Sequence, residues 1–413
     1  MVKKKVKKPH REVTKRQLSR WQQQKRRQRI IRGLGIFIIV AVLAIIGAGW
    51  YINQYQPLHQ TVIKVNDTKF NMSYYIKMLK LLGKGQSAQY MYILADEVVT
   101  VIERNELIRQ GAKELGITIS NEEVDEKLNS YDPPLSKDYR DLIRAEMLVN
   151  KLRDEYFEHQ VPISAEQRHI LAMFLESESQ AIEVRARLEA GETFAGLAGE
   201  LSLESVSKAE EADLGWRPEG VLMMLLGTSI PDEYAFGGKL GVLSQPIYDE
   251  AKTKSLGYWL IRVLERKEAS EEAHVQAILL GSKEEAQDVR ARLEASEDVD
   301  KDFAELAKDS QHTASKENGG DLDWLTPGMM SLAFDEFAFN SELELRALSE
   351  PIRDDTALTK GGYWLLKVVD IDDNRLIKDE DRDLLKAKAL NEWLSALWDN
   401  AEIDDSYLDD DKK

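Results

Sequence analysis

Hydrophobic residues recur at helical spacing through most of residues 57–163. The run ILADEVVTVIERNELIRQGAKELG, at 93–116, is the longest segment of this kind and predicts an amphipathic helix. Ser120 followed by Glu123 forms a capping box, which marks the start of the next helix. This region is therefore expected to be a helical domain, and its sequence offers no cluster of catalytic side chains.

Residues 164–373 contain two copies of one pattern. The segment VRARLEA occurs at 184–190 and again at 289–295, an offset of 105 residues. Small gaps open and close around this period, as expected for two copies of a small domain whose loops differ in length. The other matching pairs are ADLGW and GDLDW (212–216 and 320–324), EYAF and EFAF (233–236 and 336–339), SQPI and SEPI (244–247 and 349–352), and GYWLIRV and GYWLLKV (257–263 and 362–368).

Each copy has the same order of predicted elements. A short apolar strand is followed by the helix that carries VRARLEA, a second short helix, a Gly/Asp loop and a closing strand. Strands at both ends with helices between them predict an α+β fold, in which helices pack on a small antiparallel sheet. The opening strands are predicted at 170–175 and 275–280, the closing strands at 257–263 and 362–369, and the two domains at 164–268 and 269–373.

A run without any charged residue precedes all of these elements. Residues 33–51 read GLGIFIIVAVLAIIGAGWY, and a helix of these 19 residues would span about 28 Å, close to the hydrocarbon thickness of a bilayer. Residues 1–32 hold 14 Lys or Arg and one acid, whereas residues 33–413 carry a net charge of −30. The positive-inside rule then predicts a basic cytoplasmic arm at 1–32, a single transmembrane helix at 33–51, and an extracytoplasmic remainder of the chain.

Other interpretations of the two ends remain open. The apolar run could belong to a cleaved signal peptide, although both it and its basic flank are long for one. The basic arm could contact nucleic acid, but its place beside the apolar run favours the lipid bilayer as its partner, and no nucleic acid is expected. At the other end, the acid-rich residues 404–413 are expected to be a solvated, frayed tail.

Several kinds of chemistry are excluded by composition. The chain has no cysteine, which removes disulfides, thiol catalysis and a lipid-modified N-terminal cysteine. Its six histidines show no metal-ligand spacing, and there is no GxSxG, GxGxxG or P-loop motif. We therefore expect neither a metal nor a cofactor.

The repeated motifs resemble those of membrane-anchored foldases of the SurA/PrsA type, which have two parvulin-type (PpiC, rotamase) peptidyl-prolyl isomerase domains. The resemblance covers roughly residues 57–403. It implies a SurA-N-like chaperone domain at 57–163 that is completed by a C-terminal helix at 378–403, followed by two parvulin-like domains. The residues of the second copy that carry it include Phe303, Leu306, Gly320, Asp321, Trp324, Met330, Phe334, Phe339, Pro351, Gly362 and Tyr363, and those of the first copy include Phe194, Leu197, Asp213, Trp216, Phe236, Pro246, Gly257 and Tyr258.

The resemblance also implies a site in each copy. A parvulin site combines an apolar pocket for the proline ring with two histidines and a Cys or Asp. In this chain the first histidine is replaced by Ala172 and Ala277, the second by Trp259 and Trp364, and the Cys or Asp by Glu204 and His312; the pocket residues are Leu222 and Leu226 in the first copy and Met330 and Phe334 in the second. The second copy, with His312, Met330 and Phe334, is the expected catalytic site, and the remaining residues are expected to contact clients.

One alternative alignment would place His169 directly at the active histidine of the first copy. The spacing from Ala172 to Ala181, which is repeated from Ala277 to Ala286, argues against it. His169 and His274 are instead expected to be polar residues at a strand edge.

Two functions follow from these expectations. The first is an extracytoplasmic peptidyl-prolyl cis–trans isomerase and foldase that acts on unfolded or extended polypeptide clients, including X-Pro segments. The second is a non-catalytic holdase with degenerate parvulin domains, which the absence of both histidines favours.

Overall fold

The structure is a computed structural model, and it describes residues 49, 51–267 and 269–408. They form two compact units, one containing the residues up to Leu152 together with those from Trp393 on, and the other spanning Arg153–Glu392. The predicted arm at 1–32 and the predicted transmembrane helix at 33–51 lie outside the described residues, except for Gly49 and Tyr51. Within the described part, none of the helices combines the length and the apolar composition needed to cross a bilayer.

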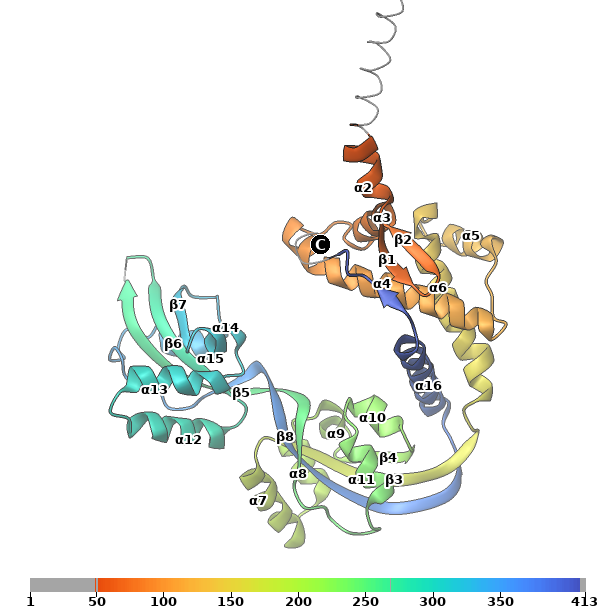
Figure 1. The fold of residues 1–413 in the computed structure, drawn as a ribbon. Helices are drawn as coiled ribbons and strands as arrows, with labels where there is room; N and C mark the ends of the chain where they lie inside the picture. Colours follow the sequence, from red (N-terminus) through yellow and green to blue (C-terminus); the bar gives the residue numbers. More distant parts are fainter. Residues whose placement is uncertain (1–48, 50, 268, 409–413) are drawn as a thin grey trace, which may run out of the picture. The chain divides into compact units, whose positions relative to one another are not determined.

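The first unit is mostly helical (Figure 1). The predicted helix at 93–116 forms most of the longest helix, and the predicted capping box is present, with Ser120 and Glu123 each bonded to the other's backbone N–H. Its elements are α2 (Gln56–His59), β1 (Thr61–Val65), β2 (Thr68–Asn71), α3 (Met72–Leu82), α4 (Ala88–Glu114), α5 (Asn121–Asn129), α6 (Arg140–Lys151), β9 (Ile403–Asp404) and the last part of α16 (Asp379–Asp399).

The end of the chain is not frayed up to residue 408, contrary to the sequence-based expectation for 404–413. Asp404 pairs with Lys64 as β9 joins the β1–β2 hairpin. Leu408 is buried in the same core as Leu394 and Trp398 of α16. The acidic composition of this segment predicted a frayed end. One buried apolar side chain and two strand pairs nevertheless hold the segment in place.

The second unit contains one six-stranded antiparallel sheet with strand order β4-β3-β8-β5-β6-β7. Two of these strands, β5 and β8, run through the whole unit (Figure 1). The elements are β3 (Ser164–Leu175), α7 (Glu178–Glu189), α8 (Phe194–Leu201), α9 (Ser205–Ala209), β4 (Asp213–Pro218), α10 (Val221–Leu226), α11 (Ile230–Gly237), β5 (Ile247–Lys267), β6 (Glu272–Leu280), α12 (Lys283–Glu294), α13 (Val299–Leu306), α14 (Thr313–Glu317), β7 (Asp321–Leu325), α15 (Leu332–Ala338), β8 (Ile352–Leu376) and the first part of α16.

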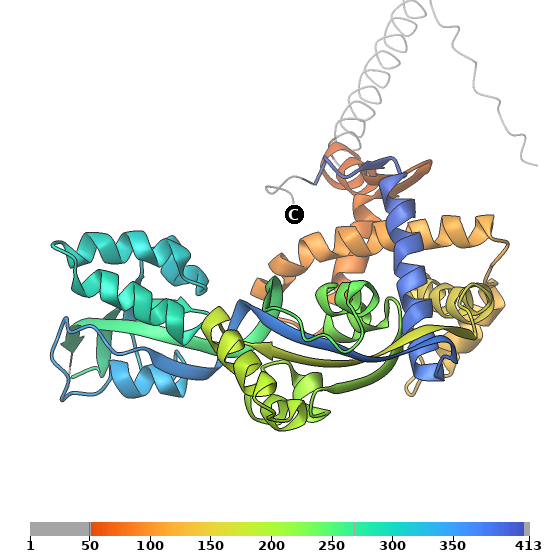
Figure 2. The ribbon, with the colours of Figure 1, turned by 90° about the horizontal axis from the view of Figure 1, so that it is seen from below.

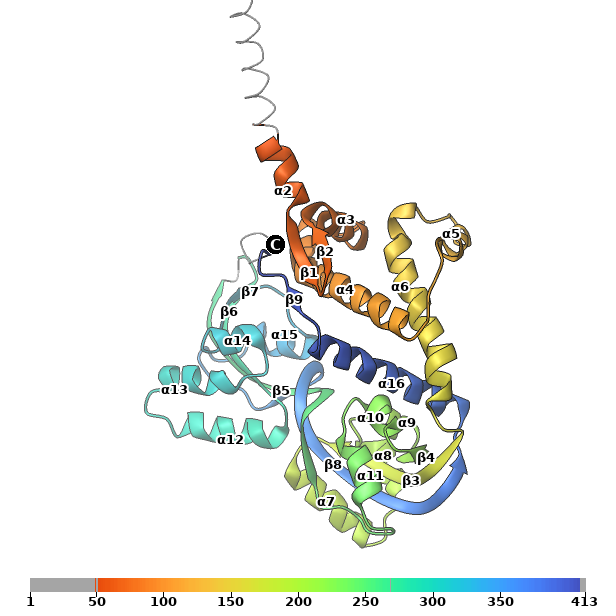
Figure 3. The same cartoon turned by 45° about the vertical axis from the view of Figure 1, so that its right-hand side comes forward.

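The two sequence copies exchange their closing strands. The opening strand of the first copy, β3, pairs with β8, so that Phe174 lies opposite Trp364. The opening strand of the second copy, β6, pairs with β5, so that Ile261 lies opposite Ala277. Figure 3 shows the blue β8 lying along the yellow β3. The boundary expected between residues 268 and 269 therefore separates strands that the structure joins.

We name the two resulting bodies by the residues that build them. Module A comprises residues 164–249 and 362–376, and module B comprises residues 257–354. Between them, residues 250–256 and 355–361 form a two-stranded antiparallel ribbon, in which Lys254 pairs with Thr359. We call this segment the connecting ribbon.

Both modules are built in three layers. Because side chains alternate along a strand, Ala172 and Phe174 of β3 face α10 and α11, whereas Met173 and Leu175 face α7 and α8. Module B repeats this arrangement, with α12 and α13 on one face and α15 on the other (Figure 2). The described part is thus mixed helix and sheet, as the sequence predicts.

Candidate functional sites

Strand exchange determines which predicted site residues come together. Module B gathers Ala277, His312, Met330 and Phe334 of the second copy with Trp259 of the first. Module A gathers residues of the first copy with Trp364 of the second; its first-copy members are Ala172, Glu204, Leu222 and Leu226. Each site is therefore a composite of both copies.

The cluster in module B is aromatic. The ring of Trp259 meets Phe334 edge-on, with centroids 5.0 Å apart, and His312 at 5.3 Å. Edge-to-face contacts of this kind are favourable and fix ring orientation. Trp259 and Phe334 are buried, whereas His312 and Met330 are half-buried. Only His312 and Met330, of the predicted residues in this module, keep substantial accessible surface for a client.

Trp259 is held by a buried carboxylate. Its indole N–H donates to Oδ2 of Asp354 at 3.0 Å, while Oδ1 of Asp354 accepts from the backbone and hydroxyl of Thr356. Burial by itself raises the pKa of the Asp354 carboxyl, but these hydrogen bonds and one from Ser331 outweigh it and lower the pKa. The residue is therefore an ionised acceptor that fixes the indole plane.

His312 caps a helix rather than forming a polar pair. Its Nδ1 accepts the backbone N–H of Ser315 at 3.3 Å, at the start of α14. This places the proton of the neutral ring on Nε2. Burial lowers the pKa of His312, so at neutral pH the ring is an uncharged donor through Nε2.

Two exposed residues that sequence reasoning missed lie close to Met330 and Phe334 along the chain. Met329 is 60% exposed and Leu332 is 75% exposed. Met329 precedes Met330 in the turn before α15, and Leu332 is the first residue of that helix. The signal was present, since TPGMMSL places apolar residues in a Pro-Gly turn where polar ones are usual.

The site in module A has the same hydrogen bond between an indole and a carboxylate as module B, but different side chains surround it. Trp364 donates its indole N–H to Asp249 at 2.9 Å and packs on Phe174 at 4.9 Å. Glu204 caps α9, where its Oε2 accepts the Ser207 N–H at 2.6 Å. Leu222 and Leu226 of α10 are buried, as are Ala172 and Trp364. None of these side chains presents an open apolar surface.

His169 and His274 serve the sheet edge. Each donates its Nε2–H to a carboxylate of the neighbouring strand, Asp213 at 2.6 Å and Asp321 at 2.8 Å. Each ring also lies against a tryptophan, with centroids 5.5 Å apart in both cases. The alternative alignment, with His169 as an active residue, gains no support from these contacts.

Comparisons with known proteins find one matching domain family and several similar chains. Residues 258–370 match the PPIC-type PPIASE domain family. The chain is 27% identical to "Chaperone SurA" of Hahella chejuensis over 84% of this chain and 78% of that protein. It is 30% identical to "Foldase protein PrsA" of Caldanaerobacter subterraneus over 43% of this chain and 59% of that protein.

Among solved structures, the PrsA peptidylprolyl isomerase of Bacillus anthracis matches 72% of this chain and 94% of its own, with 13% identity and a TM-score of 0.24. The relatives identified from the sequence thus carry the names of chaperones and foldases. The chain is therefore similar over most of its length to proteins named as SurA-type chaperones, and residues 258–370 match a PPIC-type parvulin domain.

Proposed function

We propose that the chain is an extracytoplasmic, membrane-anchored folding factor that binds extended client segments at module B and accelerates isomerisation of their X-Pro bonds. The observation that carries this proposal is the aromatic cluster of Trp259, Phe334 and His312, against which the partly accessible Met330 packs. An exposed apolar group next to a rigid aromatic wall suits a proline ring or an aromatic side chain.

Isomerisation of an X-Pro bond requires few chemical groups from the site. Rotation about an X-Pro bond faces a barrier of roughly 18–20 kcal/mol and needs no nucleophile. An apolar environment destabilises the charge-separated planar amide, and a single donor such as Nε2–H of His312 can favour the twisted form. His312, Met330 and Phe334 are the residues we assign to this step.

A second candidate function is a non-catalytic holdase. It is favoured by the Trp259 indole N–H, which is already committed to Asp354 and so cannot polarise a client. Under this alternative, module B binds the same clients without increasing the rate of isomerisation.

Client binding is tested by removing the exposed apolar rim. The double variant Met329→Ser with Leu332→Ser should bind a Phe-Pro-containing peptide about tenfold more weakly, a loss of about 1.4 kcal/mol, because client contact there buries apolar area. The measurement is fluorescence anisotropy with full-length protein in lipid nanodiscs. The matched control is Leu240→Ser with Val242→Ser in module A, both also exposed. An equal loss in both variants would place binding elsewhere.

The same preparation separates catalysis from holding. Exchange spectroscopy on the peptide's cis and trans proline signals should show acceleration by the wild-type protein, and His312→Asn should reduce it about 100-fold. Asn can still cap α14, which keeps the local fold. Peptide binding without any acceleration would leave the holdase as the function.

Anchoring is tested separately. The full chain should stay in the membrane pellet after alkaline carbonate extraction, whereas a chain that begins at residue 57 should be released, because only the former retains the apolar run at 33–51. Protease added to the outer face should digest the part after residue 57. Release of the full chain, or its complete protection, would contradict the proposed anchor or its orientation.

A further inference from the structure

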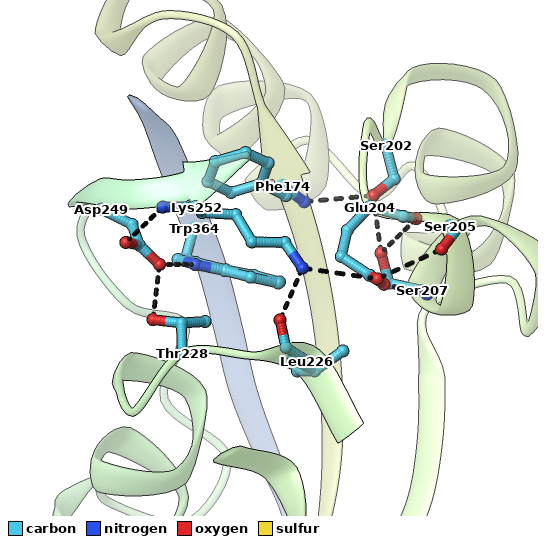
Figure 4. Close-up of polar contacts among 10 residues, drawn as sticks. All are labelled: Phe174, Ser202, Glu204, Ser205, Ser207, Leu226, Thr228, Asp249, Lys252 and Trp364. Atoms are coloured by element: carbon cyan, nitrogen blue, oxygen red, sulfur yellow. Dashed lines mark hydrogen bonds and ion pairs between the residues drawn. The ribbon is translucent and has the colours of Figure 1, made fainter. Parts of the chain in front are cut away.

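The place in module A that corresponds to the client cluster of module B is occupied by a lysine of the connecting ribbon. The Lys252 ammonium donates to the backbone oxygen of Leu226 at 2.6 Å and lies 3.6 Å from Oε1 of Glu204. It also lies 5.9 Å from the ring centroid of Trp364. Figure 4 shows the side chain reaching between Glu204 and the end of α10. Only 13% of the side chain is exposed.

The backbone around Lys252 is fixed. Oδ1 of Asp249 accepts the N–H groups of Ala251 and Lys252, both at 3.1 Å. Its Oδ2 accepts from the indole of Trp364 and, at 2.7 Å, from the hydroxyl of Thr228. The carboxylate that orients the tryptophan thus also orients the lysine.

The charge is balanced inside the site. Glu204 is buried, and its second oxygen is held by the start of α9. Removing one partner of a buried pair leaves the other charge uncompensated, which is strongly unfavourable. Neither Lys252 nor Glu204 therefore leaves its position easily.

Module B lacks this pair. The 105-residue period aligns Asp249 with Asp354 and Lys252 with Ala357. His312 takes the helix-capping place of Glu204. With no lysine to insert and no carboxylate to receive one, His312 and Met330 of module B keep accessible surface, whereas their counterparts in module A are buried.

We propose that module A is a closed copy of the client pocket whose internal occupant is the Lys252 ammonium, so that clients enter module B alone. Lys252 lies over Trp364, the counterpart of Trp259, so the aromatic wall is of the same chemical type in both modules. This inference rests on the proposed client site for its ligand class, but it makes a separate statement about module A.

Photo-cross-linking on the full-length protein in nanodiscs tests it. A Phe-Pro peptide that carries a benzophenone should label wild-type protein around α15 and not around α10, as mapped by mass spectrometry. The double variant Lys252→Ala with Glu204→His recreates the pair found in module B and should add labelling at α10. The reciprocal variant Ala357→Lys with His312→Glu should abolish labelling at α15. Lys208→Ala, at an exposed lysine of α9, is the matched control and should behave as wild type.

The outcomes distinguish the closed pocket in module A from the proposed client site in module B. Labelling of α10 in the wild type would overturn the closed pocket. Labelling of α10 only after Lys252→Ala with Glu204→His, with none at α15 in any sample, would support the closed pocket and overturn the proposed site in module B. Absence of labelling at both helices in every sample would overturn both.

A measurement without substitution guards against misfolded variants. In the wild type, Lys252 should react with an amine-acylating reagent at least tenfold more slowly than the exposed Lys208, because its ammonium is enclosed. Equal rates for the two lysines, quantified by peptide mass spectrometry, would overturn the proposal whether or not the variants fold.

Discussion

A chain carrying His169→Cys and Asp370→Cys should oxidise almost completely to an intramolecular disulfide. These positions lie directly opposite each other on β3 and β8, and cross-strand partners have the separation that a disulfide needs. The wild-type chain has no cysteine, so mobility on non-reducing gels and peptide mapping report this single bond. The result tests strand exchange directly.

The matched control is His169→Cys with Glu265→Cys. Glu265 occupies in the first copy the place that Asp370 occupies in the second, 105 residues later. Both double variants lose the contact between His169 and Asp213, so any destabilisation is shared. The control pair should stay reduced, and rapid oxidation of the control instead of the test pair would mean that each copy closes with its own strand.

Trp364→Ala should be the most destabilising single change considered for module A. The indole is fully buried, packs on Phe174 and satisfies Asp249. Its removal should cost about 3–5 kcal/mol through lost burial and a residual cavity, and it leaves the buried carboxylate short of a donor. The control Trp216→Ala, at a half-buried ring on the sheet edge of the same module, should cost clearly less.

Hydrogen exchange locates the damage. Amides of β3 should lose protection in the Trp364→Ala protein, while those of α4 in the first unit should be unchanged, because no strand of that unit pairs with β8 in the described residues. Loss of protection in β6 without loss in β3 would mean that Trp364 stabilises module B and not module A. Denaturant titration with urea gives the size of the change.

The sequence predicted the elements of the second unit well, because local patterns determine them. The second short helix expected in the first copy is α8, and the strands expected at 170–175 and 275–280 lie within β3 and β6. Which closing strand pairs with which opening strand was not predictable from the repeat. GYWLIRV and GYWLLKV are almost the same segment, so either can complete either copy, and the antiparallel connecting ribbon favours the exchanged pairing.

For the sites as well, positions along the chain were predictable and contacts between distant segments were not. The periodicity and the family resemblance together located the positions of Trp259, Trp364, Glu204 and His312, but not their neighbours across the exchanged strands. The sequence does not single out Lys252, because a lysine in the polar run YDEAKTKSLG is typical of a solvated strand. Only tertiary structure brings it against Trp364 and Glu204. In the same way, eight of the ten expected site residues proved to be buried, which a one-dimensional pattern does not report.

The exchanged strands also set the order in which the protein can mature on the ribosome. Contacts that complete module B are local: Arg262 bonds to Gln276 across only 14 positions. Module A instead requires Gln167 to reach Arg375, 208 positions later. Closing so long a loop is entropically costly and slow. The apolar β3 therefore lacks its partner strand until module B has been synthesised, and the nascent chain exposes this strand during that time.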